Sequence, residues 1–165
     1  CALPIYRIGD TGCTLLDTRK TIPGLRYLSK YAVRCGGARN HRMGLYDGVL
    51  IKDNHVAACG GIGEAVRRAK AGANVSIEVE CDTLAQVAEA VAAGADVILL
   101  DNMQPEEMRR AVALVGNAAK TEASGGVTLA TVRAIAETGV TYVSAGRITQ
   151  SAPAVDIGLD WAPQP

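Results

Sequence analysis

The chain alternates short apolar runs with helical patterns, and this alternation limits the folds open to it more than any other feature. Strand candidates are residues 13–16, 48–51, 75–79, 97–100, a weaker one at 118–122, and 141–145. Helix candidates are residues 25–34, 62–71, 83–93, 105–115 and 129–138. Strands that alternate with helices across short loops indicate βα units and a parallel sheet.

Several of the predicted helices carry signals at their ends. Four of them are followed closely by a glycine, which is typical of a C-terminal stop: Gly72, Gly94, Gly116 and Gly139. Pro105 suits the first turn of its helix, and Thr83 and Thr128 stand where N-caps are expected.

The number of units limits the architecture. Six strands and about five helices are fewer than the eight units, roughly 250 residues, of a complete (β/α)8 barrel. The 165 residues show no linker, low-complexity segment or charge run. We therefore expect one α/β domain, an incomplete or open barrel of about six parallel strands with its active site at the C-terminal strand ends. Phe is absent, so the core must be built from Ala, Val, Leu and Ile, which suits helices on a buried parallel sheet.

We expect the catalytic barrel domain to span residues 12–165. Residues 1–11 are predicted to be a non-native or partial segment, because one back-translation of residues 1–5 reads like the end of a common sequencing adapter.

Composition bears on partners and location. Seventeen basic and seventeen acidic residues cancel, so bulk charge does not indicate a nucleic-acid or membrane surface. No apolar run approaches the length of a membrane span. The five cysteines lie far apart without a Cys-x-x-Cys pattern, which predicts reduced thiols in a cytoplasmic protein.

Charged residues gather where the predicted strands end. Along the chain they are Asp17, Arg19, Lys20, Lys52, Glu80, Asp101 and Glu122, and the segment before Lys52 adds His41 and Arg42. Glu80, Asp101 and Glu122 are twenty-one residues apart, one βα repeat, so we expect them at equivalent places. Because the carboxyl ends of parallel strands form the binding face, cations and carboxylates should converge on one mouth.

Such an array suits an anionic ligand together with Mg²⁺, which takes one or two carboxylates plus ligand oxygens. The competing interpretation makes the carboxylates structural partners of neighbouring Arg and Lys side chains.

Two glycine-rich turns follow the last two predicted strands, Ser124-Gly125-Gly126 and Ala145-Gly146. Backbone N–H groups at such turns can approach phosphate oxygens closely. A tight turn that needs positive φ is the competing explanation. Two such turns at adjacent late strands favour a phosphate site.

Seven separated blocks, in order and with compatible spacing, resemble quinolinate phosphoribosyltransferase (nicotinate-nucleotide diphosphorylase, carboxylating). They are residues 17–26, 40–47, 50–55, 77–80, 99–102, 122–126 and 156–160, and the resemblance covers about residues 12–161. It implies a pentosyltransferase of NAD biosynthesis, which converts quinolinate and phosphoribosyl pyrophosphate to nicotinate mononucleotide, pyrophosphate and CO2 with Mg²⁺.

The resemblance also implies roles for individual residues. Those expected to hold the two carboxylates of quinolinate are Arg19, His41, Arg42 and Lys52, while Lys20 would face the phosphate-bearing substrate. Glu80 and Asp101 would act in catalysis beside the ribose hydroxyls and the magnesium ion. The 5′-phosphate would be cradled by Ser124, Gly125 and Gly146.

Two departures from the family pattern matter. Gln150 stands where the family usually has a histidine, so we expect a weaker contact to phosphate. The N-terminal domain of the family is missing from the chain. In the family that domain covers the partner subunit's barrel and supplies an arginine to quinolinate. The complete protein is therefore expected to be a homodimer or higher homo-oligomer, and this chain alone to be inactive.

Two alternatives remain open from the sequence. One is the paralogous phosphoribosyltransferase-like protein associated with molybdenum transport, against which Lys52 argues because the paralogue tends to lose that lysine. The other is a non-catalytic anion-binding fragment.

Overall fold

A computed structural model describes residues 2–159, so Asp160 and Trp161, at the end of the resembling region, lie outside the described residues. Within that range the strands are β1 (Thr14–Leu16), β2 (Val49–Ile51), β3 (Ile77–Cys81), β4 (Val97–Asp101), β5 (Lys120–Ser124) and β6 (Tyr142–Ser144). The helices are α1 (Ala2–Ile8), α2 (Arg26–Cys35), α3 (Asp53–Cys59), α4 (Ile62–Gly72), α5 (Leu84–Ala92), α6 (Pro105–Val115), α7 (Val132–Ala136) and α8 (Arg147–Gln150).

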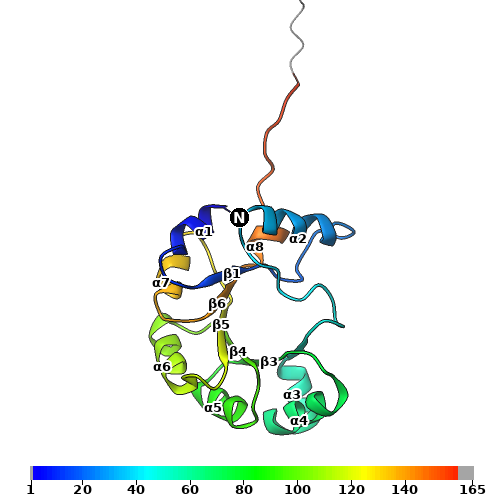
Figure 1. The fold of residues 1–165 in the computed structure, drawn as a ribbon, viewed down its shortest axis with the longest axis vertical. Helices are drawn as coiled ribbons and strands as arrows, with labels where there is room; N and C mark the ends of the chain where they lie inside the picture. Colours follow the sequence, from blue (N-terminus) through cyan, green and yellow to red (C-terminus); the bar gives the residue numbers. More distant parts are fainter. Residues whose placement is uncertain (1, 160–165) are drawn as a thin grey trace, which may run out of the picture.

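The strands form one all-parallel sheet in the order β1-β6-β5-β4-β3-β2. Helices form a ring outside the curved sheet (Figure 1). Among the described residues β1 and β2 are the two edges and do not pair with each other, so the barrel is not closed. The structure thus confirms the prediction of an open α/β barrel of six parallel strands.

Side chains alternate between the two faces of the sheet, as a pleated strand requires. In β3, Ile77, Val79 and Cys81 are buried and belong to the apolar core, whereas Glu78 and Glu80 point to the barrel interior. The outward-facing layer is built from Val, Ile, Leu and Ala, as predicted from the absence of Phe. The interior therefore stays available for charged side chains.

All six predicted strands are present, but β3 and β5 begin and end two residues later than predicted. Val75 is 36% exposed and precedes β3 instead of opening it. The shift corrects the expectation that the three carboxylates spaced twenty-one residues apart lie at equivalent places. Glu80 and Glu122 each align with Leu99 of β4, whereas Asp101 aligns with Ser124, one inward-facing position nearer the strand ends.

Helix signals were partly correct. Thr83 accepts a hydrogen bond from the Gln86 N–H at the start of α5, and Pro105 opens α6. The Thr128 hydroxyl accepts the Thr131 N–H (3.3 Å), as an N-cap does, but α7 begins only at Val132, later than predicted. The sequence patterns did not predict the short helices α1, α3 and α8.

Residues 1–11 were expected to be non-native or partial, and that origin stays a prediction. Within this segment α1 packs against α7 and β1. At the other end, residues 151–159 form no helix or strand and extend away from the ring beside α8 (Figure 1). None of the helices between residues 2 and 159 combines the length and apolar character needed to cross a lipid bilayer.

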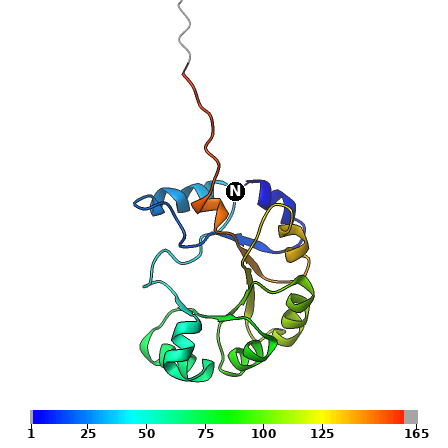
Figure 2. The ribbon, with the colours of Figure 1, turned by 180° about the vertical axis from the view of Figure 1, so that it is seen from behind.

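The segment between α2 and β2 crosses the open side of the barrel, which both views show (Figures 1 and 2). It is tied to β1 by a single parallel bridge between Leu16 and Arg39. Beyond this bridge the connection depends on a buried ion pair, since Asp17 and Lys30 are 0% and 1% exposed and their Oδ1 and Nζ atoms lie 2.5 Å apart.

Both charges of this pair are hydrogen-bonded on several sides. Asp17 also accepts hydrogen bonds from the Asn40 side-chain amide (2.7 Å) and the His41 N–H (2.8 Å). Lys30 donates a second hydrogen bond to the His41 carbonyl (2.9 Å). A buried charge is tolerated only when it is paired and satisfied in this way. The pair therefore fixes where the segment enters the barrel mouth.

Replacing Asp17 by Ala should leave the Lys30 ammonium buried and unpaired, and should reduce the free energy of unfolding by about 3–5 kcal/mol. Urea unfolding of the 165-residue chain measures this. As a matched control, Glu64→Gln breaks an exposed ion pair with Arg67 and should leave the urea midpoint nearly unchanged. An Asp17→Ala variant as stable as the Glu64→Gln variant would contradict the structural role of the pair.

Candidate active site

A cavity of about 490 Å³ opens at the C-terminal ends of the strands. Its lining includes nine of the residues that sequence reasoning placed at the site: Arg19, Lys20, His41, Arg42, Lys52, Glu80, Asp101, Ser124 and Gly125. A second cavity of about 240 Å³ shares Lys20, Ser124 and Gly125 with the first and adds Gly146 and Gln150. The structure therefore brings all eleven predicted site residues together at one end of the barrel.

The cationic side of the larger cavity is poorly compensated by the protein itself. Partial burial and then the positive charge of Arg19 lower the pKa of Arg42, so the two guanidinium groups lie close enough to repel. Within residues 2–159, Nε of Arg19 is buried and donates no hydrogen bond. Two adjacent guanidinium groups with donors to spare are suited to an anionic ligand.

Two of the cations, Arg42 and Lys52, have an anchor in the backbone or in a neighbouring carboxylate. Arg42 donates a hydrogen bond to the Gly48 carbonyl (3.1 Å), and Lys52, at the end of β2, forms an ion pair with Glu80 of β3. The Lys52 N–H donates to Nδ1 of His55 (3.0 Å) in the first turn of α3. The second histidine of the chain thus holds the lysine in place from outside the cavity.

Asp101 and the first glycine-rich turn are linked through Asn102. Asn102 has a left-handed φ of 52°, donates its side-chain amide to Asp101 (2.8 Å), and donates its N–H to the Ser124 carbonyl (2.9 Å). Gly125 has a φ of 92°, and a Cβ built there would lie only 2.1 Å from Oδ1 of Asn102. Glycine is required at 125 by both its backbone angle and this contact.

The second glycine-rich turn faces Lys20 and Gln150. A Cβ at Gly146 would meet Lys20 Cδ at 3.4 Å and Gln150 Cδ at 3.6 Å. The Thr149 hydroxyl in α8 donates to the Lys20 carbonyl (2.6 Å), which ties this turn to the loop after β1. The smaller cavity thus combines Lys20, Arg147, one neutral amide and two glycine turns, a donor set that suits phosphate.

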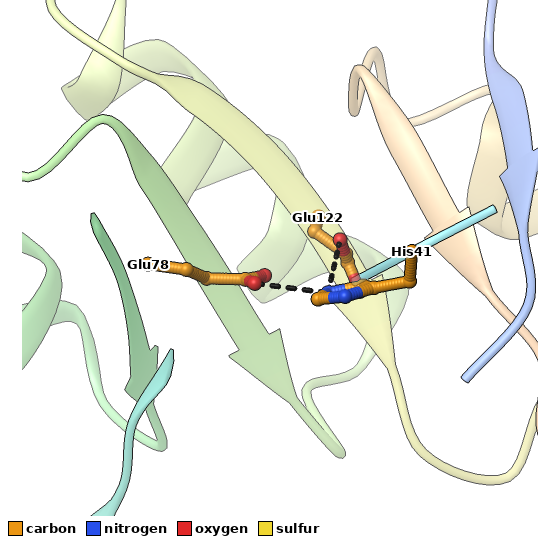
Figure 3. Close-up of side chains that lie close together, drawn as sticks. All are labelled: His41, Glu78 and Glu122. Carbon is orange, nitrogen blue, oxygen red and sulfur yellow. Dashed lines mark ion pairs between the residues drawn. The ribbon is translucent and has the colours of Figure 1, made fainter. Parts of the chain in front are cut away.

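His41 lines the larger cavity, but its ring points into the barrel interior toward two glutamates (Figure 3). Nε2 of His41 lies 2.9 Å from Oε2 of Glu78 and 3.6 Å from Oε2 of Glu122. Nδ1 accepts a hydrogen bond from the Arg42 N–H (2.7 Å), which places the ring proton on Nε2. Both ring nitrogens are thus engaged within the protein.

The electrostatics of this cluster follow from burial. Burial, followed by the negative charge of Glu78, raises the pKa of Glu122 to about 8. For His41, burial lowers the pKa. The interaction with Glu78 and the charges of both glutamates raise it by more than burial lowers it, so the pKa of His41 lies above its ordinary value. The cluster therefore favours a retained proton near neutral pH.

A larger open depression of about 1110 Å³ lies at the opposite, N-terminal ends of the strands. Its charged lining residues are Lys70, Asp96 and Lys120. It lacks the paired guanidinium groups and glycine turns of the other end, and ligands of parallel sheets bind at the carboxyl ends of the strands. We therefore assign the candidate site to the two connected cavities.

Comparison with known proteins identifies the family. The family model described as quinolinate phosphoribosyl transferase, C-terminal domain, matches residues 3–160. The chain belongs to this family. Family membership agrees with the resemblance of the seven sequence blocks, and the geometry of the cavities is compatible with it.

Two relatives and one solved structure show how close the match to the family is. The chain is 54% identical over 155 residues to a probable nicotinate-nucleotide pyrophosphorylase [carboxylating] of Bacillus subtilis, covering 93% of this chain and 54% of the relative. It is 46% identical to the chloroplastic nicotinate-nucleotide pyrophosphorylase [carboxylating] of Arabidopsis thaliana, covering 88% of this chain and 47% of the relative. The nicotinate-nucleotide pyrophosphorylase of Ehrlichia chaffeensis superimposes with a TM-score of 0.92 at 46% identity, covering 96% of this chain and 58% of that one. The chain thus spans about half the length of the curated relatives it matches.

Sequence reasoning missed residues that act behind the cavity wall. Lys30 is a helix residue that no strand-end argument selects, although the structure pairs it with Asp17. Glu78 did carry a signal, because it lies two residues before Glu80 and therefore on the same face of a strand. Asn102 was read only as a neighbour of Asp101.

The raised pKa of Glu122 predicts how stability depends on pH. Between its ordinary value of 4.5 and about 8, the folded protein keeps a proton that the unfolded chain releases. The contribution of Glu122 is therefore complete below about pH 4.5 and is lost as pH rises through 8, with a slope of up to about 1.4 kcal/mol per pH unit.

Urea unfolding of Glu122→Gln between pH 5 and 8 should show a smaller loss of stability with pH than wild type does. Glu64→Gln is the matched control, since Arg67 and Arg68 lower the pKa of Glu64 to about 2, outside this range. Equal pH slopes for wild type and Glu122→Gln would contradict the buried, proton-bearing state of Glu122.

Proposed function

We propose that the chain forms the catalytic barrel of an enzyme that transfers a phosphoribosyl group to quinolinate with decarboxylation. The products are nicotinate mononucleotide, CO2 and pyrophosphate, a step of NAD biosynthesis. The observation that carries this proposal is the meeting of three guanidinium groups, two lysines, three carboxyl side chains and two glycine turns in connected cavities. The names of the relatives support the same reaction.

The cationic wall suits the two carboxylates of quinolinate. Arg19 and Arg42 repel each other and both line the cavity, so a dianion between them would relieve the repulsion and gain charge-assisted hydrogen bonds. Lys52 lines the same cavity beside Glu80 and can contribute a third positive charge. His41 shapes the pocket from behind, since its ring nitrogens already bond within the protein.

The smaller cavity suits the 5′-phosphate of the phosphoribosyl donor. Lys20 and Arg147 supply positive charge, and Gln150 supplies a neutral amide. Short donors come from Ser124 and the turns at Gly125 and Gly146. Since the two cavities share Lys20 and Ser124, a ligand can extend from one into the other.

The carboxylates fit an Mg²⁺ ion carried by the pyrophosphate group of the donor. Glu80 and Asp101 stand on neighbouring strands and line the same cavity, and one or two carboxylates plus phosphate oxygens are the usual magnesium ligands in proteins. Bound there, the ion would neutralise charge on the departing pyrophosphate.

The geometry accounts for the chemistry mainly through positioning and charge. The ring nitrogen of quinolinate attacks C1 of the ribose as the bond to pyrophosphate breaks, and positive charge develops on the sugar ring. Glu80 and Asp101 favour this charge. The carboxylate next to the ring nitrogen then leaves as CO2, and a proton takes its place on the ring carbon.

A homodimer or higher homo-oligomer is part of the proposal. The outer face of α2 exposes Tyr27, Leu28 and Tyr31 at 75%, 65% and 60%, an apolar surface of the kind that subunits or domains cover. Activity of the complete protein is proposed to need the family's N-terminal domain, and this chain alone is predicted to be inactive. The cytoplasmic location also stays a prediction.

Quinolinate binding should depend on Arg42. In Arg42→Ala one ligand carboxylate loses its partner, which should weaken binding by on the order of 2–4 kcal/mol. Calorimetric titration of the 165-residue chain with quinolinate, and KM in the complete protein, measure this. The exposed Arg110→Ala is the matched control. Unchanged quinolinate affinity in Arg42→Ala would contradict the assignment, and binding of phosphate without quinolinate would favour the anion-binding fragment.

Turnover should depend on Asp101. Asp101→Asn keeps the shape of the side chain but removes a charge that favours the cationic transition state, so kcat of the complete protein should fall roughly 100-fold. The exposed Asp82→Asn should retain activity. If Asp101→Asn instead lowers the melting temperature and leaves kcat intact, the carboxylate is structural.

A further inference from the structure

The opening of the barrel leaves Arg42 without a pairing strand, because the pairing of its segment with β1 ends at Arg39. Among the described residues β1 and β2 do not pair, and this segment lies between them. Strand pairing therefore cannot fix Arg42, and its position must come from side-chain contacts.

His41 supplies contacts that reach across the barrel. Its backbone is held by Asp17 and Lys30, and its ring extends to Glu78 of β3 and Glu122 of β5 (Figure 3). The ring also accepts the Arg42 N–H at Nδ1. One side chain thus connects the segment to the opposite wall and to the backbone of the next residue.

The two glutamates are costly to keep where they are. Glu78 and Glu122 are 6% and 2% exposed. In the part of the chain that the structure describes, Oε1 of each is buried and accepts no hydrogen bond. Inward-facing barrel positions are usually filled by Val, Ile or Leu, which avoid this cost. Carboxylates at such positions indicate a role beyond stability.

We propose that Glu78 and Glu122 are positioning residues, which hold His41 across the barrel and thereby fix Arg42 at the ligand cavity. The 2.9 Å contact between Nε2 of His41 and Oε2 of Glu78 orients the imidazole, and the oriented imidazole accepts the Arg42 N–H. The Arg42 guanidinium is fixed from the other side by the Gly48 carbonyl. This inference rests on the proposed function, because it assigns the glutamates to quinolinate affinity.

The test compares removal of the acceptor with its conservative replacement. Glu78→Ala and Glu122→Ala in the complete protein should raise the quinolinate KM about tenfold, with kcat and the KM for phosphoribosyl pyrophosphate within about twofold of wild type. Glu78→Gln keeps an acceptor for His41 Nε2 and should bring the quinolinate KM back to within about threefold of wild type. The exposed Glu107→Gln is the matched control.

A readout independent of turnover uses the 165-residue chain. Hydrogen exchange of residues 39–48 should be faster in Glu78→Ala than in wild type, while α5 exchanges at the wild-type rate. This measurement also shows whether each alanine variant is folded. If Glu122→Ala is not folded, the comparison of Glu78→Ala with Glu78→Gln carries the test.

Four results would overturn the proposal. They are wild-type exchange of residues 39–48 in both alanine variants, an unchanged quinolinate KM, failure of Glu78→Gln to restore it, and a melting temperature that Zn²⁺ raises in wild type but not in Glu78→Ala. The last would assign the cluster to a metal ion instead. A wild-type complete protein without quinolinate-dependent turnover would contradict the proposed function, and the exchange experiment would still test the positioning role.

Discussion

The ion pair between Asp17 and Lys30 is the interaction on which the mouth of this barrel depends. In the described part of the chain, pairing joins the six strands in sequence around the barrel, but β1 and β2 do not pair, so the barrel is open between them. At that opening the chain uses a buried carboxylate as a hub that accepts hydrogen bonds from a lysine, an asparagine and a backbone amide. A buried ion pair adds little net stability, but it tolerates only one arrangement of its partners. That selectivity suits a segment that carries Arg42 into the lining of the cavity.

The two faces of the sheet have different roles in the molecule. Alternation along each strand sends the apolar residues outward, where α4, α5, α6 and α7 cover them. The same alternation turns Glu78, Glu80 and Glu122 inward. The barrel interior thereby holds charged side chains beside a few apolar ones such as Leu50 and Leu99, and the core outside the sheet must carry most of the stability. A small domain can maintain a charged interior only because its hydrophobic layer is complete without it.

Much of this was predictable from the sequence, and the failures have physical causes. The alternation of strands and helices fixed the parallel sheet, and the charged residues after the strands identified the cavity at its C-terminal end. The exact strand limits were not predicted, because Val75 and Ala118 extend the apolar runs without belonging to the strands. For the same reason Glu122 was predicted to end its strand, whereas β5 continues for two more residues to Ser124 and Glu122 faces the barrel interior. Lys30 and the engaged ring of His41 could not be predicted, because long-range pairing inside a barrel leaves no local pattern.

The contact between Gly125 and Asn102 has a consequence for how this site can change over evolutionary time. Any side chain at 125 would displace Asn102, and Asn102 holds the carboxylate of Asp101. A substitution at Gly125 would therefore affect the carboxylate of the neighbouring strand without touching it. Residues 125 and 102 are therefore coupled, and a change in the first loop alters the surroundings of the second.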